Sequence, residues 1–374
     1  MMRSGLLLFF IGLAACSPPV TKSKAKIEEF RQYLEKSRTD DGVLLESRML
    51  AGSNGLVWEN SGKYQGDILL DDSQLEDLVA DFAGVSNDNN RNAFVVANTR
   101  WPNNVMIFNY ASNEFNNAQQ NAIRTAMSWI EHFSCVRFRW RSNERVFVRM
   151  TGNPTGCYAH VGFSTAHPNR VLNLARNNHC FSHGVIIHEL LHSLGFQHMH
   201  QTYERDSFVR INWNNIISGQ EFAFTRFPRN QVNLHGLPYE YTSIMHYHNQ
   251  AFSRNRQPTI VPLRSFSGTM GQMEQTSYWD WLRLRRHYNC PGAWNRNSEE
   301  IMKKEVERTL PLIKLNLPAP KQGLFTDEDN AYVRALNADT NNEDIDNEEA
   351  MDYEDSDNEN NNFNEDIGND NYEN

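Results

Sequence analysis

Residues 188–198 read His188-Glu189-Leu190-Leu191-His192-Ser193-Leu194-Gly195-Phe196-Gln197-His198, and their spacing predicts a helix that carries a metal centre. Residues four apart share one face of a helix, so His188 and His192 are expected to bind the same ion. Glu189 projects beside them, where it reaches a water molecule at the metal without being a ligand. Gly195 suits the left-handed conformation that ends a helix, and His198 then arrives from outside the helix as a third ligand. Three protein ligands leave a fourth position open, which is typical of a catalytic zinc ion and not of a structural one.

A second motif, Ser243-Ile244-Met245-His246-Tyr247, lies downstream. The short pattern His188-Glu189-x-x-His192 occurs by chance in unrelated helices, but the extended pattern fixes five residues and makes chance a poor explanation. Together the two motifs resemble the astacin family of metzincin metalloproteases. The resemblance implies that Met245 forms the methionine turn beneath the zinc ion. It also implies that Tyr247 reaches the metal site and stabilises the transition state.

The resemblance covers about residues 92–290. Trp101-Pro102-Asn103 is similar to the start of the mature catalytic domain in this family, and residues 277–290 are similar to its closing helix. An α+β fold is implied, in which a twisted mixed sheet and a buried zinc-binding helix lie above a cleft, with an irregular lower half that includes a C-terminal helix. Where this chain has Met199, relatives usually have a glutamate that meets the buried mature amino terminus, and residues 200–204 also differ. This departure concerns the amino-terminal salt bridge and not the zinc site.

Hydrophobic periodicity and capping residues predict the main elements of this domain. Ser182 is suited to cap the zinc-binding helix, and apolar residues nearly encircle that helix, which predicts that it is buried. Helices are predicted at about 24–36, 117–133 and 276–288, and strands at 136–140, 146–150 and 171–174.

Charge is distributed unevenly along the 374 residues. Residues 92–294 contain 19 Arg, no Lys and 10 Asp and Glu, whereas residues 298–374 contain 6 Lys and Arg and 22 Asp and Glu. The arginines are scattered and no nucleic-acid motif accompanies them, so nucleic acid is not an expected partner. Two interpretations of the basic domain stay open: solvated surface charge, or a cleft that favours acidic residues near the scissile bond, as the resemblance implies. Residues 295–374 are predicted to form an acidic, Asn-, Asp- and Glu-rich disordered tail.

The amino terminus and the cysteines indicate export. Leu6–Ala15 is an apolar run behind Arg3 that is too short to span a membrane, and it predicts a signal peptide over residues 1–16 and a secreted protein. The alternative is that Leu13-Ala14-Ala15-Cys16 is a bacterial lipoprotein box, with Cys16 acylated and the protein anchored to a membrane. The four other cysteines allow three pairings. The resemblance implies the pairs Cys135–Cys290 and Cys157–Cys180.

Residues 17–91 are predicted to form a propeptide that is rich in loops outside its helix. The stretch Tyr64-Gln65-Gly66-Asp67-Ile68 resembles the latency motif of the family, although Tyr64 stands where phenylalanine is usual. In that motif an aspartate takes the open zinc position. A carboxylate is a competent zinc ligand, so Asp67 is expected to silence the enzyme, whereas the alternative is that Gly66-Asp67 is simply a turn. Arg91 is a candidate cleavage site for an activating trypsin-like protease, and the catalytic domain then spans residues 92–294.

The implied function is hydrolysis of peptide bonds in extracellular proteins by a zinc-dependent endopeptidase made as a latent zymogen. Glu189 is predicted to act as general base and then to pass the proton to the leaving amine. Tyr247 and the zinc ion are predicted to stabilise the oxyanion. The alternative is a catalytically weak or inactive zinc-binding or adhesive protein that retains the fold. Loss of Glu189, of a ligand or of Tyr247 would indicate that alternative, and the sequence retains all of them.

Overall fold

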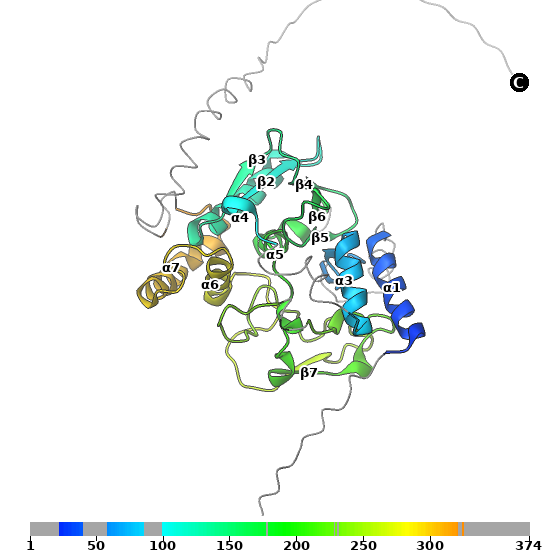
Figure 1. The fold of residues 1–374 in the computed structure, drawn as a ribbon. Coiled ribbons are helices and arrows are strands. Elements are labelled where there is room, and N and C mark those ends of the chain that lie inside the picture. The colour runs from blue at the N-terminus through cyan, green and yellow to red at the C-terminus, as the bar shows by residue number, and fades with distance from the viewer. Residues whose placement is uncertain are drawn as a thin grey trace, which may run out of the picture. The chain divides into compact units, whose positions relative to one another are not determined.

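The framework of the fold is a mixed six-stranded sheet with the strand order β1-β5-β6-β4-β2-β3 (Figure 1). The computed structural model describes residues 22–39, 58–85, 99–176, 179–227, 229, 232–320 and 324. Neighbouring strands run parallel, except that β5 and β6 are antiparallel. The strands are β1 (Ile68–Leu69), β2 (Val105–Tyr110), β3 (Arg137–Trp140), β4 (Phe147–Thr151), β5 (Cys157–His160) and β6 (Asn169–Leu174).

Helices pack on this sheet and around it. The α-helices are α1 (Lys24–Thr39), α3 (Asp72–Ala83), α4 (Asn117–Phe133), α5 (His183–Ser193), α6 (Tyr278–His287) and α7 (Arg296–Lys314). Short 3₁₀ helices lie at Trp58–Asn60, Pro102–Asn104, His179–Phe181, Met199–Gln201, Arg205–Ser207, Trp213–Asn215 and Glu221–Phe224. The three helices and three strands predicted from the sequence are confirmed to within three residues at each end. The α+β fold class is confirmed as well.

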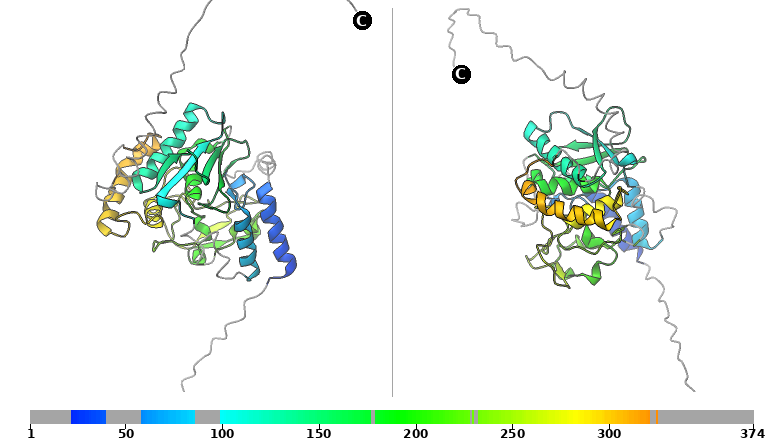
Figure 2. Two further views of the ribbon diagram at one scale, coloured as in Figure 1. Left: turned by 45° about the horizontal axis from the view of Figure 1, so that its top comes forward. Right: turned by 90° about the vertical axis from the view of Figure 1, so that its left-hand side faces the viewer.

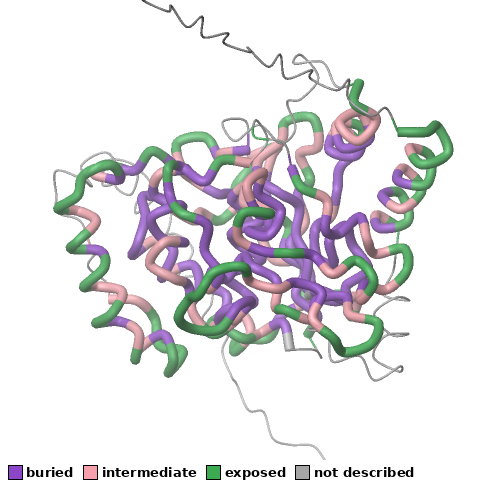
Figure 3. Tube along the Cα trace, turned by 90° about the horizontal axis from the view of Figure 1, so that it is seen from below, coloured by how far each residue is buried: buried purple, intermediate pink, exposed green. Residues whose placement is uncertain are grey.

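Helix α5 lies at the centre of the molecule, and all of its residues are buried. Its first turn is capped by the Ser182 side chain, which accepts a hydrogen bond from the backbone N–H of Val185. The chain turns away after the helix at Gly195, whose φ is +103°. A Cβ atom at this position would lie 2.7 Å from Oγ1 of Thr99, so both conformation and space require glycine. Buried residues gather around this centre and exposed residues lie toward the periphery (Figure 3).

The part of the chain after α5 is poor in regular structure. Its two-stranded antiparallel sheet pairs β7 (Val209–Ile211) with β8 (Ile260–Pro262). One disulfide, Cys135–Cys290, joins the segment after α4 to the segment after α6, and the other, Cys157–Cys180, joins β5 to the turn before α5. These are the pairings that the family resemblance implies. No helix in the described part of the chain combines the length and the apolar character that a membrane span requires.

The described residues before residue 92, which are 22–39 and 58–85, fold against the domain that follows. Strand β1 extends the sheet by pairing with β5, and α1 lies beside α3 (Figure 1). Both helices share an apolar cluster with Phe222 and Phe227. Helix α3 falls in a region predicted to be loops, and that prediction is wrong. Its signals are a capping box formed by Asp71 and Gln74, and Gly84 at the C-cap with φ +71°.

Helix α7 lies next to α6 (Figure 2), inside the segment predicted as a disordered tail. Its buried side chains include Met302, Thr309 and Ile313, and Glu305 Oε1 lies 2.9 Å from Nε2 of His132 on α4. The prediction of disorder from residue 295 is therefore wrong for residues 296–314, because side chains at helical spacing pack on the domain. The predicted signal peptide, Arg91 and residues 326–374 lie outside the described residues.

Candidate active site

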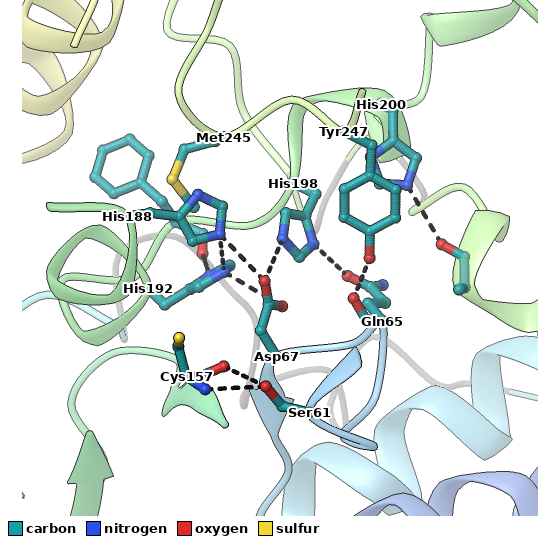
Figure 4. Close-up of polar contacts among 12 residues, drawn as sticks. Ser61, Gln65, Asp67, Cys157, His188, His192, His198, His200, Met245 and Tyr247 are labelled. Carbon is teal, nitrogen blue, oxygen red and sulfur yellow. Dashed lines mark hydrogen bonds and ion pairs between the residues drawn. The ribbon is translucent and has the colours of Figure 1, made fainter. Parts of the chain in front are cut away.

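Three imidazoles and one carboxylate converge beside α5 (Figure 4). Asp67 Oδ2 lies 3.2 Å from Nε2 of His188 and 3.3 Å from Nε2 of His198, and Asp67 Oδ1 lies 3.6 Å from Nε2 of His192. All four side chains are buried. A tetrahedral zinc ion with bonds of ~2.1 Å separates neighbouring ligand atoms by about 3.4 Å, so these donors fit one zinc ion.

The second ring nitrogens of the two helix-borne histidines are held by backbone carbonyls. Nδ1 of His188 donates to the carbonyl oxygen of Ile244, and Nδ1 of His192 donates to that of Phe196, both at 2.8 Å. These bonds place the proton on Nδ1 and leave Nε2 free to bind a metal. Burial lowers the pKa of His192, and it lowers the pKa of His198 to about 4, so neutral imidazoles are favoured.

Glu189 occupies the helix position next to His188 and is fully buried. Neither of its carboxylate oxygens has a hydrogen-bond partner among the described residues. Burial, and then the negative charge of Asp67, raises the pKa of Glu189 well above its ordinary value. A buried carboxylate with unused oxygens and a raised pKa is suited to take up a proton.

Tyr247 lies on the opposite side of the Asp67 carboxylate from α5 (Figure 4). Its hydroxyl donates a hydrogen bond to the backbone carbonyl of Gln65. Its ring stacks on His200, with 3.8 Å between the ring centroids, and lies 4.6 Å from the ring of His198. Met245 lies beside His188 and its carbonyl oxygen accepts a hydrogen bond from Met199, at 2.8 Å. The second motif and the zinc-binding stretch therefore meet at one site.

Met199, the departure from the family pattern, is buried in the apolar cluster of the lower half together with Tyr247. On another side it lines a cavity of about 30 Å³. The described residues around this cavity include Gln197, Arg283 and His287, and no carboxylate is among them. The side chains at the cavity therefore offer no acidic partner for a buried ammonium group.

Further histidines lie close to the site. His246 lies between the hydroxyl of Tyr239, at 2.7 Å, and the carbonyl of Tyr247, whereas His183 is buried with no hydrogen-bond partner among the described residues. His248 contacts Glu59 at 3.0 Å. Sequence reasoning missed Glu59 and gave Gln65 no role. The only sequence feature that pointed to a role for Gln65 was its position two residues before Asp67.

Neutral imidazoles that share one ion beside an unpaired buried carboxylate are typical of zinc endopeptidases. The helix that ends at a glycine before the third histidine, with a methionine turn beneath, defines the metzincin class among them. The chain belongs to the astacin family, since the model of the Astacin peptidase family matches residues 94–289. It is a zinc metalloendopeptidase with an intact histidine triad.

Relatives in this family resemble the chain over half of its length or more. Zinc metalloproteinase nas-4 of Caenorhabditis elegans is 33% identical over 238 residues, which are 63% of this chain and 72% of the relative. Low choriolytic enzyme of Oryzias latipes is 37% identical over 195 residues, which are 51% of this chain and 69% of the relative. Among solved structures, high choriolytic enzyme 1, a hatching enzyme zinc-protease of Oryzias latipes, is 34% identical. The match covers 51% of this chain and 93% of the chain in that structure, with a TM-score of 0.47.

Proposed function

We propose that this chain is the latent precursor of a secreted endopeptidase, in which residues 17–91 form a propeptide and residues 92–294 the catalytic domain. One observation carries the proposal: Gln65 and Asp67 cover the three histidines and the Tyr247 hydroxyl, which a substrate must reach. Asp67 faces all three histidines, and the Gln65 carbonyl takes the hydrogen bond of Tyr247. A substrate carbonyl has no access to the metal or to the tyrosine while this segment is bound.

The ionisation of Asp67 supports its role as the blocking ligand. Burial by itself would raise the pKa of this carboxyl group. The three histidines around Asp67, His198 foremost, oppose this effect of burial and hold the pKa of Asp67 well below its ordinary value. Asp67 therefore favours the carboxylate form, which is the form that binds zinc. An ordinary Gly-Asp turn would not require a fully buried aspartate.

The chain's own residues account for the catalytic steps once the segment has left. The zinc ion, when bound, lowers the pKa of a water molecule and polarises the scissile carbonyl. Glu189 takes up the proton released when water attacks, and its unused oxygens then carry that proton to the leaving amine. Tyr247, whose hydroxyl donates here to a peptide carbonyl, donates to the substrate's carbonyl oxygen as negative charge develops on it.

Secretion, activation and substrate preference follow from other parts of the sequence. Residues 1–16 act as a signal peptide, and the lipid-anchored form through Cys16 is the alternative for a bacterial source. A trypsin-like protease cleaves after Arg91. The substrates are extracellular proteins, and acidic residues near the scissile bond are favoured by the 19 Arg against 10 Asp and Glu in residues 92–294.

The test of catalysis is Glu189→Ala in the full-length chain, treated with trypsin and assayed on casein. Wild-type protein is expected to cleave casein and to stop when a zinc chelator is added. The variant is expected to retain one zinc ion per chain and to lose activity by a factor of about 10²–10⁴. Cleavage at the wild-type rate by the variant would contradict the assignment. Zinc-containing wild-type protein that never cleaves would favour the inactive zinc-binding alternative.

A further inference from the structure

The three histidines differ in what holds the ring nitrogen that faces away from the metal. For His188 and His192 this partner is a backbone carbonyl within residues 94–289. For His198 it is Oε1 of Gln65, at 3.0 Å from Nδ1 (Figure 4). The third ligand is therefore oriented by the segment that, under the proposed function, leaves on activation.

His198 depends on such a partner more than the other two ligands do. His188 and His192 are carried by α5, whose backbone and packing restrict the directions of their side chains. His198 follows the turn at Gly195 and has extended backbone angles, φ −66° and ψ 140°. Its ring is buried against Tyr247, and Gln65 supplies the hydrogen bond that distinguishes one ring nitrogen from the other.

Gln65 is held in a conformation that needs compensation. Its φ is +55°, in the left-handed region that side-chain-bearing residues avoid. The following Gly66 closes the turn with a bond from its N–H to the Lys63 carbonyl, and a Cβ atom on Gly66 would lie 2.7 Å from backbone atoms of Glu59. This turn aims the Gln65 backbone carbonyl at Tyr247 and its side-chain carbonyl at His198. Two hydrogen bonds thus hold an otherwise unfavourable backbone.

We propose that Gln65 is a positioning residue for the metal site: its side-chain oxygen accepts the Nδ1 proton of His198 and so directs the Nε2 lone pair at the zinc ion. The inference rests on the proposed function, because it assigns a second task to the segment that blocks the site. The segment covers the metal through Asp67 and completes the outer hydrogen bonding of the ligands through Gln65. The precursor therefore retains zinc more firmly than the same chain without this acceptor.

The test measures the rate at which the intact full-length precursor transfers zinc to a chromogenic chelator. Gln65→Gly removes only the side chain, keeps the backbone carbonyl and suits φ +55°, so the backbone and its bond to Tyr247 are preserved. Zinc transfer is expected to be about 10–100-fold faster in this variant. Gln65→Glu keeps an acceptor for Nδ1 and is expected to stay within about threefold of wild type.

Ser61→Ala is the matched control for loosened docking of the segment. The Ser61 hydroxyl bonds both the carbonyl and the N–H of Cys157 on β5, at 2.9 and 3.0 Å. This variant is expected to transfer zinc at a rate near that of wild type. In the cobalt-substituted precursor, Gln65→Gly is expected to shift the visible absorption bands and Ser61→Ala to leave them unchanged.

The outcomes separate this inference from the proposal of latency. A zinc transfer rate in Gln65→Gly equal to that of wild type would contradict the positioning role of Gln65. An equal acceleration of zinc transfer in Gln65→Gly and Ser61→Ala would contradict it as well. Both results can be obtained while the precursor remains inactive on casein. Conversely, an uncleaved wild-type precursor that digests casein contradicts latency, whatever the zinc transfer rates.

Discussion

Two of the described segments outside the family-matched residues 94–289 bind it by different chemistry. Residues 58–69 reach the metal site with buried polar groups, above all Asp67 and Gln65. Helix α7 lies next to α6 with Met302 and Ile313 buried, and its polar contacts include Glu305 with His132 on α4 and Glu299 with Arg286 on α6. The first segment covers the three histidines and Tyr247 with polar groups, besides burying Tyr64 and Ile68 in an apolar cluster, whereas α7 covers mainly apolar surface.

The difference indicates which segment is built to leave. A buried polar group is stable only with its partners, so the polar segment holds one well-defined position on the site and no other. Its removal exposes groups that water and substrate can satisfy. Apolar packing stabilises by area and leaves a hydrophobic surface exposed when it is lost. We therefore expect changes in residues 58–69 to alter activity, and changes in α7 to alter stability.

The largest effect is expected from Asp67→Ala in the uncleaved precursor. Removing one partner from a buried charged cluster costs about 3–5 kcal/mol, and each 1.4 kcal/mol is a factor of ten in an equilibrium constant. Casein cleavage by the precursor should therefore rise by about 10²–10³-fold. Asp72→Ala is the matched control, since the Asp72 carboxylate on α3 pairs with Arg38 on α1 at the surface of the proposed propeptide. If both variants remain inactive, Asp67 is not the latency residue.

Removal of α7 is expected to have the next largest effect, on stability alone. A chain that ends at residue 295 loses the burial of Met302 and Ile313, worth about 3 kcal/mol at the low end for two such side chains. Its Tm should fall by about 10 °C. A chain that ends at residue 325 keeps the helix and should keep the Tm. After activation, both truncated chains should cleave casein at room temperature at rates close to that of wild type.

A large loss of activity in the chain that ends at residue 295, measured at a temperature at which it is still folded, would contradict this expectation. It would mean that α7 contributes to the site and not only to the support of α4 and α6. Calorimetry and kcat/KM on the same preparations distinguish these cases, because an unfolded fraction lowers kcat and leaves KM unchanged.

A smaller effect is expected from Glu305→Ala, which tests the polar contact between α7 and α4. The variant leaves Nε2 of His132 buried and without the carboxylate that it contacts at 2.9 Å. Loss of such a partner costs about 1–2 kcal/mol of the free energy of unfolding. Glu307→Ala, at an exposed position on the same helix, should change it by less than about 0.5 kcal/mol. Equal stabilities of the two variants in urea would show that this contact contributes nothing.

The features that sequence predicted best are those set by short spacing. His188 and His192 meet because they are four residues apart on a helix, and α4 follows from its apolar face and capping residues. The position of α7 was missed because residues 296–314, which contain four Glu and five Lys and Arg, were grouped with the acidic tail that follows them. Its buried residues Met302, Thr309 and Ile313 nevertheless share one helical face, behind an Asn295 cap.

Contacts between distant residues could not be predicted in the same way. Gln65 and His198 are 133 residues apart, and Glu59 and His248 are 189 apart. No periodicity links such pairs, because they meet only when the tertiary fold brings the segment onto the site. The family resemblance predicted Asp67 as the ligand that blocks the zinc site. It gave no information about Gln65 and Glu59, whose contacts are formed by this chain's own side chains.

The smallest effect is expected from the Glu59–His248 contact, and it depends on pH. Burial lowers the pKa of His248, but the charge of Glu59 and its hydrogen bond outweigh burial, so the pKa is raised. The contact therefore stabilises the docked segment below the ordinary His value of about 6.5, and this contribution is lost as pH rises through the raised pKa. In a Glu189→Ala background, which prevents self-cleavage, Glu59→Gln should lower the free energy of unfolding by about 1 kcal/mol at about pH 6. The difference should vanish near about pH 9, and His248→Gln should abolish it. An unchanged difference across this range would mean that Glu59 acts by packing and not by charge.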